Sequence, residues 1–131
     1  MSERKPVVLV VEDDPIIRMV TTSFVSDAGF EAVEADSADE AIRILKARSD
    51  IHLVFTDIGL PGTMDGLKLA HFIATRWPPV KLVVASGMMI VEQGQLPAGA
   101  KFFPKPYHHN AITKALTEML SPRNRPSLSA A

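Results

Sequence analysis

Side chains able to do chemistry stand at four places in the chain, each close behind a short apolar run. They are Glu12 with Asp13, then Asp57, Ser86 and Lys105. Oxygen ligands without histidine or cysteine favour a hard cation, Mg²⁺ or Mn²⁺, that keeps some of its waters. Three carboxylates within a few ångströms of one another would also raise each other's pKa unless a cation joined them. A divalent metal site is therefore the first chemistry that these residues suggest.

A lysine and a serine add groups that a metal site alone does not need. Lys105 supplies a fixed positive charge and Ser86 a hydroxyl donor, so the whole set suits a dianionic phosphoryl group. We expect Asp57 to be the most exposed of the three carboxylates, which makes it the natural nucleophile. Each group also has a plainer explanation, because an acidic pair often caps a helix and a lysine is often a surface residue.

These groups meet only if the apolar runs form one parallel sheet. Five strand-like runs alternate with helix-like segments, the pattern of an α/β fold with helices on both faces of the sheet. The expected strands are 7–11, 31–35, 51–55, 80–85 and 102–103. The first, third and fourth are apolar throughout and suit the interior, whereas the alternating second and the short fifth suit edges. Right-handed crossovers then predict a doubly wound, flavodoxin-like (βα)5 fold of strand order 2-1-3-4-5, with its ligand site at the carboxyl ends of the strands.

Helices are expected between these strands. Asp14 is placed to cap a first helix that buries one apolar face. That face is predicted to comprise Ile17, Val20, Phe24 and Val25. Ile16 and Met19 fall off this face beside the acidic pair, where they are either scattered surface residues or part of a docking surface. Before Pro97, only a short fourth helix fits within 88–95.

Composition bounds the function classes. The chain has 131 residues, 47% of them hydrophobic, with a net charge of -1 and no cysteine. These values fit one globular domain over 1–121, and they exclude thiol chemistry and a basic nucleic-acid surface. No apolar stretch reaches the ~20 residues of a membrane span, so we expect a cytoplasmic protein without membrane or nucleic-acid partners. Residues 122–131, rich in Pro, Arg, Asn and Ser, are expected to form a disordered tail.

Four motifs at the predicted strand ends resemble the response-regulator receiver domain of two-component signalling. They are Val10-Val11-Glu12-Asp13-Asp14-Pro15, Thr56-Asp57-Ile58-Gly59-Leu60-Pro61-Gly62, Ala85-Ser86-Gly87 and Pro104-Lys105-Pro106. Each motif alone is weak. In order and at suitable spacing over about residues 6 to 121, the four together are highly specific.

The resemblance implies an acceptor and a metal site. Asp57 would accept a phosphoryl group from a sensor histidine kinase or a histidine phosphotransfer protein. Glu12 and Asp13 would hold Mg²⁺ together with Asp57, and the backbone carbonyl of Gly59 would complete the protein ligands.

The resemblance also implies a switch. Lys105 would pair with the phosphoryl oxygens, next to a cis bond to Pro106. Ser86 would move toward the phosphoryl group after transfer, and Phe102, in place of the more usual tyrosine, would follow it inward. Since the sequence ends soon after the last expected helix, the resemblance suggests a stand-alone receiver whose output is protein contact. Such contact could include homodimerisation through the face of the fourth helix and fifth strand.

Two further departures from the family pattern and three competing functions remain. In the family, the residues two past the aspartate and two past the serine tune water access to the acyl phosphate. Here they are Gly59 and Met88, which predict slow self-dephosphorylation. A phosphorylation-independent interaction domain on the same fold is the main alternative. An aspartyl-phosphate phosphatase would want a second aspartate where Gly59 stands, and a flavin phosphate would be repelled by the acidic residues 12–14.

Overall fold

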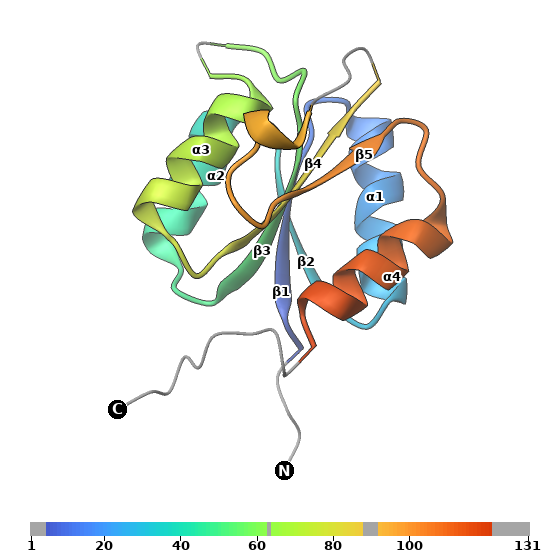
Figure 1. Cartoon of the computed structure of the whole chain (residues 1–131). Helices are drawn as coiled ribbons and strands as arrows, with labels where there is room; N and C mark the ends of the chain where they lie inside the picture. The colour runs from blue at the N-terminus through green and yellow to red at the C-terminus, as the bar shows by residue number, and fades with distance from the viewer. Residues whose placement is uncertain (1–4, 63, 88–91, 122–131) are drawn as a thin grey trace.

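One parallel sheet forms the centre of the protein. The computed structural model describes residues 5–62, 64–87 and 92–121. The strands are β1 (Val7–Val11), β2 (Glu31–Ala35), β3 (Ile51–Asp57), β4 (Lys81–Ser86) and β5 (Lys101–Pro104). They lie parallel in the order β2-β1-β3-β4-β5 (Figure 1), so the predicted fold class and strand order 2-1-3-4-5 are confirmed.

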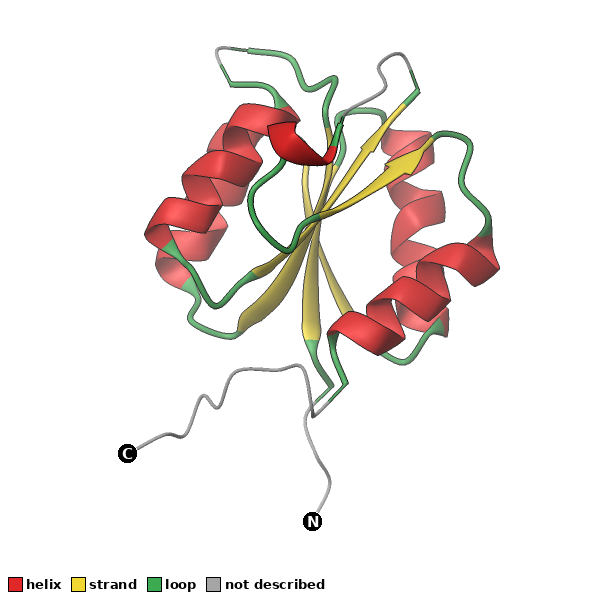
Figure 2. Cartoon of the chain, in the orientation of Figure 1, coloured by secondary structure: helices red, strands yellow, loops and turns green. Residues whose placement is uncertain are grey.

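Helices cover both faces of the sheet. They are α1 (Pro15–Asp27), α2 (Ala38–Ala47), α3 (Gly66–Arg76) and α4 (His109–Met119). Figure 2 shows helices on both sides of the sheet, and the core clusters place α2 with α3 on one face and α1 with α4 on the other. Successive strand side chains point to opposite faces. Accordingly Leu9 and Val11 pack on the α2–α3 side, while Val8 and Val10 pack on the α1–α4 side.

The helix caps hold the loops at the carboxyl ends of the strands. The Asp14 side chain accepts hydrogen bonds from the backbone N–H groups of Ile16 (2.8 Å) and Ile17 (3.1 Å), as its predicted N-cap role requires. Asp65 caps α3 in the same way through the N–H of Lys68 (2.8 Å). Both caps satisfy donors that a helix start leaves unpaired. The two helix starts thereby fix the turns that follow β1 and β3.

The predicted buried face of α1 is wrong in part. Thr21 and Val25 are buried, whereas Ile17 and Val20 are 36% and 42% exposed. An evenly apolar helix gives no clear periodicity, so its rotation is set by what the sheet accepts. The small Thr21 fits against the strand ends near β1, and this turns the longer aliphatic side chains outward.

The segment between β4 and β5 contains only a short helical element within the described residues. The five helices predicted from the sequence become four α-helices within the described residues, and Gln93–Gln95 forms a single 3₁₀ turn, η1. Gly94 and Pro97 limit a longer helix there. Residues 88–91, on which half of the expected helix falls, lie outside the described part of the chain, as do residues 122–131. Among the described helices, none has both the length and the apolar character that crossing a membrane requires.

Candidate functional site

Four strands deliver the predicted site residues to one edge of the sheet. Glu12 directly follows β1, Asp57 and Ser86 are the last residues of β3 and β4, and Lys105 directly follows β5. The parallel registers align these ends, because Asp57 pairs with Ala85 and Ser86 pairs with Pro104. The carboxyl edge therefore gathers every charged group that the motifs singled out.

The three carboxylates form one cluster. Single oxygens of Glu12, Asp13 and Asp57 all lie within 4.8 Å of one another. Glu12 is buried, Asp13 is exposed, and the Asp57 side chain is only 13% exposed. The expectation that Asp57 is the most exposed carboxylate is thus wrong. Asp57 is the last residue of β3, and the N–H of the following residue, Ile58, donates to the Ala85 carbonyl (2.9 Å). Asp13 lies in the loop after β1.

Lys105 joins two of these carboxylates. Its Nζ donates to Glu12 Oε1 at 2.9 Å and lies 3.2 Å from Asp57 Oδ1. Burial works against the Lys105 ammonium. The hydrogen bond to Glu12 and the charges of Asp57 and Glu12 outweigh burial and hold its pKa above the ordinary lysine value. The lysine therefore stays charged at the point where an incoming anion would meet Asp57.

Negative charge is still in excess at this edge. Burial raises the pKa of Glu12, and the nearby charge of Asp57 adds to the effect, although the hydrogen bond from Lys105 lowers it. Three carboxylates face a single ammonium in the cluster. An all-oxygen donor set with excess negative charge fits a hard divalent cation such as Mg²⁺, with Mn²⁺ as the alternative. The residues present thus fit the metal that the sequence predicts.

Two glycines shape the backbone around Asp57. Gly59 is exposed, and a Cβ added there would lie 3.5 Å from Asp57 Oδ2, an ordinary contact, so the position beside Asp57 has room for a small side chain. A Cβ at Gly66 would instead overlap the backbone carbonyl of Asp57. The N–H of Gly66 donates to the Ile58 carbonyl (2.9 Å), which brings the start of α3 directly against the end of β3.

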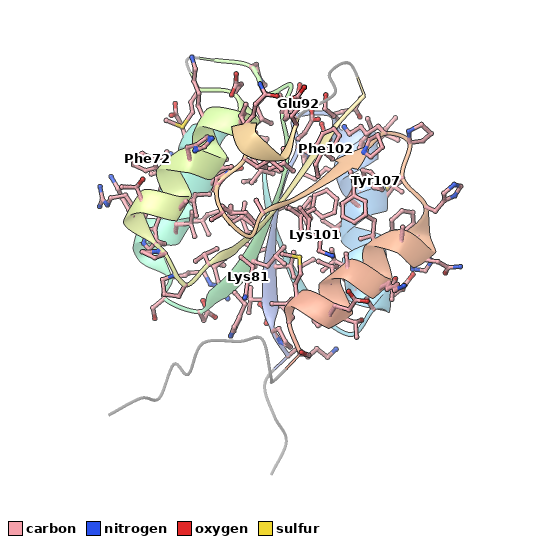
Figure 3. All side chains as sticks on the ribbon, viewed as in Figure 1. Phe72, Lys81, Glu92, Lys101, Phe102 and Tyr107 are labelled. Carbon is pink, nitrogen blue, oxygen red and sulfur yellow. The ribbon has the colours of Figure 1, made fainter. Side chains whose placement is uncertain are left out.

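The two predicted switch residues lie on β4 and β5. Ser86 is buried, and its carbonyl accepts the N–H of Lys105 (2.9 Å), which ties the serine strand to the lysine. Phe102 is half-buried and packs with the α2–α3 cluster, while Tyr107 packs with α1 and α4 on the opposite face. Both side chains are labelled in Figure 3. The assigned movements of Ser86 and Phe102 stay predictions.

Three side chains that the sequence motifs did not single out support this edge. The guanidinium of Arg18 donates to the Glu12 carbonyl (2.8 Å) and pairs with Glu34 (3.0 Å). Thr21 Oγ1 and Tyr107 Oη form a hydrogen bond of 2.6 Å between α1 and the segment after Lys105. Arg18 lies one helical turn after the Asp14 cap. Its position near Glu12 could have been predicted, because helical side chains lean toward the helix N-terminus. For Tyr107, the sequence offered only the general rule that a buried tyrosine hydroxyl usually has a hydrogen-bond partner, without indicating which one.

An apolar groove of about 460 Å³ lies beside the carboxylates. It is lined by Ile16, Ile17, Val20, Thr21, Phe24, Lys105, Pro106 and Tyr107. Ile16 is 68% exposed and the neighbouring Met19 is 61% exposed. All the large hydrophobic side chains that stand out as exposed among the described residues belong to α1. The predicted cis bond between Lys105 and Pro106, on the other wall of the groove, is confirmed.

Known proteins with the same features are receiver domains. The family model "Response regulator receiver domain" matches residues 8–117. The response regulator protein FleR of Pseudomonas aeruginosa is 36% identical over 108 residues, which cover 80% of this chain and 22% of FleR. The chain thus spans about a fifth of the length of that relative.

Solved structures agree with the sequence match. A response regulator receiver protein from Sinorhizobium medicae shares the fold with a TM-score of 0.84 and 26% identity, covering 93% of this chain and 99% of that one. The response regulator TrrA of Thermotoga maritima, solved with Mg²⁺ and BeF, has a TM-score of 0.75 at 21% identity and covers 87% and 98%. The chain belongs to the receiver domain family of two-component response regulators.

Proposed function

We propose that this chain is a cytoplasmic phosphoacceptor that takes a phosphoryl group on Asp57 from the phosphohistidine of a sensor histidine kinase or histidine phosphotransfer protein. One observation carries the proposal. The Lys105 ammonium reaches both Asp57 (3.2 Å) and Glu12 (2.9 Å) at the end of the sheet. A phosphoryl group on Asp57 would therefore form within reach of a fixed positive charge, which is the stabilisation that phosphoryl transfer needs.

The transfer step itself is a simple displacement. An oxygen of the Asp57 carboxylate attacks phosphorus, the bond between phosphorus and the donor histidine nitrogen breaks, and that nitrogen keeps the bonding pair. Lys105 moves from its contact with Asp57 to the phosphoryl oxygens and continues to bond Glu12. The product is an acyl phosphate at a position that the α3 start holds against the sheet through Gly66.

The proposal includes a divalent metal. Glu12, Asp13, Asp57 and the backbone carbonyl of Gly59 would hold Mg²⁺, or Mn²⁺ in its place. When bound, the metal supplies positive charge next to the transferred oxygens and offsets the carboxylate excess. The protein's own contribution is to keep the three carboxylates within 4.8 Å and to oppose them with Lys105. The presence of Mg²⁺ and BeF in TrrA supports this assignment.

The exposed side of α1 is part of the same proposal. A protein donor has to cover the surface around Asp57 while its histidine reaches the acceptor. The apolar groove shares Lys105 with the acceptor site, and Ile16 and Met19 extend its apolar surface along α1. We therefore assign this surface to an amphipathic helix of the donor, which would lay its apolar face into the groove. The sequence left Ile16 and Met19 as either scattered surface residues or part of a docking surface, and we interpret both as docking residues.

Output is proposed to follow through protein contacts. Ser86 and Phe102 would rearrange around the acyl phosphate and change the surface near β5, through which a downstream target or a second copy could bind. The stand-alone arrangement stays a prediction.

Intact-mass spectrometry tests the proposed function. The protein is incubated with Mg²⁺ and acetyl phosphate, alongside Asp57→Asn and a control, Asp50→Asn, that removes a carboxylate at the other end of the sheet. We expect one added phosphoryl group in the wild type and in the control and none in Asp57→Asn. No gain with any phosphoryl donor in the presence of Mg²⁺ would leave the phosphorylation-independent interaction domain as the better explanation.

A second arm tests the docking surface. The variant Ile16→Ser/Met19→Ser is compared with the wild type for phosphoryl uptake from acetyl phosphate and from a panel of autophosphorylated sensor histidine kinases. We expect unchanged uptake from acetyl phosphate and slower uptake from any kinase that serves the wild type. Equal uptake from that kinase would contradict the docking assignment.

A further inference from the structure

The hydrogen bond between Thr21 and Tyr107 joins two segments that are far apart in the sequence. Thr21 is a buried hydroxyl on α1, and Tyr107 lies two residues after Lys105. The oxygens are 2.6 Å apart, and burial raises the pKa of the tyrosine, so the phenol keeps its proton. The bond therefore ties the lysine segment to the helix that begins just after the acidic pair.

The same two residues lie directly behind the acceptor site. Thr21 and Tyr107 line a small recess together with Glu12, Asp57 and Lys105. The Tyr107 ring also packs against Phe55, with ring centroids 5.5 Å apart, and Phe55 is two residues before Asp57 on the same strand. Tyr107 thus touches the acceptor strand with its ring and α1 with its hydroxyl, and the backbone that carries it also carries the lysine.

The chain on either side of Tyr107 has contacts of its own, among them the stacking of His109 at the start of α4 on Phe24 of α1, with ring centroids 4.7 Å apart. Lys105 is fixed on its strand side by the bond from its N–H to the Ser86 carbonyl. On the helix side, His108 is the N-cap of α4 but forms no side-chain capping hydrogen bond. The Tyr107 side chain therefore anchors the link between the lysine and α4.

We propose that Tyr107 is a positioning residue for phosphoryl transfer: its hydroxyl, held by Thr21, fixes the segment that aims the Lys105 ammonium at Glu12 and Asp57. The proposal rests on the proposed phosphoacceptor function and deepens it. It assigns no contact between Tyr107 and the phosphoryl group. Because both residues also line the groove assigned to the donor, a docked helix would lie against this same hydrogen bond.

The test removes each hydroxyl with little change in shape. Tyr107→Phe keeps the ring against Phe55, Thr21→Val keeps the branched side chain, and Thr21→Ser keeps the hydroxyl but loses the methyl group. The rate of phosphorylation by acetyl phosphate with saturating Mg²⁺ is followed by intact mass, and Mg²⁺ affinity is measured by calorimetry. Thermal melting of each variant verifies that it is folded.

We expect Tyr107→Phe and Thr21→Val each to slow phosphorylation by about three- to tenfold, the size of one net hydrogen bond. The double variant should be no slower than the slower single variant, since both remove the same bond. Thr21→Ser should restore most of the rate, and Mg²⁺ affinity should stay within about twofold because the metal ligands do not change. A merely structural role would lower the melting temperature but would not separate rate from metal affinity in this way.

Other results would overturn the inference. Wild-type rates in both Tyr107→Phe and Thr21→Val, effects that multiply in the double variant, or a Thr21→Ser rate as low as that of Thr21→Val would each contradict it. In all of these cases the wild-type protein still takes up phosphoryl. If the wild type takes up none, it is the proposed function that fails.

Discussion

The two ends of the sheet carry similar charged residues and use them in different ways. At the amino end, the guanidinium of Arg48 donates to both Asp50 oxygens at 2.8 Å and reaches Glu31 at 3.4 Å. At the carboxyl end, the Lys105 ammonium forms ion pairs with Glu12 and Asp57, and a carboxylate oxygen of Asp13 lies within 4.8 Å of those two carboxylates. The Arg48 cluster is open to solvent, whereas Glu12 is buried.

The two ends of the sheet differ in the direction in which folding shifts the pKa of a carboxylate. The hydrogen bond from Arg48 holds the pKa of Asp50 below its ordinary value, so that carboxylate gains from the folded state. Burial instead raises the pKa of Glu12, so its charged form is disfavoured by the fold. Paired charges in solvent contribute to structure, while partly buried charges left in excess are costly unless a ligand joins them. We infer that the carboxyl end keeps this cost because it is a binding site.

Removing the cation that contacts both Glu12 and Asp57 should have the largest effect. We expect Lys105→Ala to slow phosphorylation by acetyl phosphate by about 10²- to 10³-fold, because one preorganised charge opposite the transferred oxygens is lost. Phosphorylation rates from intact mass measure the change. Lys101→Ala is the matched control, since that lysine lies at the other end of β5 and is paired only weakly with Glu118 (4.0 Å). Equal phosphorylation rates in Lys105→Ala and Lys101→Ala would contradict the proposed difference between the two ends of the sheet.

Removing one carboxylate should weaken metal binding more modestly. Asp13→Asn is expected to lower Mg²⁺ affinity by tenfold or more, about 1.4 kcal/mol, because one charged ligand is lost. Without Mg²⁺ the same variant should melt at a slightly higher temperature, since repulsion within the cluster is relieved. Calorimetry and thermal melting test both parts. Asp50→Asn should leave Mg²⁺ affinity unchanged, and a loss there would show that the two ends are not independent.

The lack of a side chain at Gly59 should determine how long the phosphoryl group stays on Asp57. Gly59→Asn is expected to shorten the phosphoryl lifetime several-fold, because an amide side chain beside Asp57 can orient a water molecule toward phosphorus. Gly59→Ala adds only a Cβ in ordinary contact, 3.5 Å from Asp57 Oδ2, and should leave the lifetime unchanged. The decay of the added mass after removal of the donor measures this. A wild-type lifetime of seconds would count against the predicted slow self-dephosphorylation.

The smallest effect is expected at the amino end. Asp50→Asn should lower the free energy of unfolding by less than about 1 kcal/mol, as for other exposed ion pairs. Because the folded state lowers the pKa of Asp50, its contribution is present above the unfolded pKa and is lost as the pH falls through the folded pKa. Denaturant unfolding of both proteins at neutral and at acid pH tests this. A difference that grows on acidification would contradict the sign.

The sequence allowed the fold and the main site to be predicted because both depend on local patterns. Apolar runs that end in Glu12, Asp57 and Ser86 indicated the strands and the edge at which their side chains meet. The rotation of α1 was not accessible, because it depends on how Thr21 packs against the sheet. The hydrogen bond between Thr21 and Tyr107 is a contact across 86 residues that no local pattern encodes.

The position of the acyl phosphate tests the central claim most directly. Protein phosphorylated with acetyl phosphate is reduced with sodium borodeuteride, which converts an aspartyl phosphate to deuterated homoserine, and the digest is mapped by tandem mass spectrometry. We predict homoserine at position 57 alone, with none in the sample that received no phosphoryl donor. A label on Glu12 or Asp13, or an added phosphoryl group without any label at Asp57, would contradict the assignment of Asp57 as the acceptor.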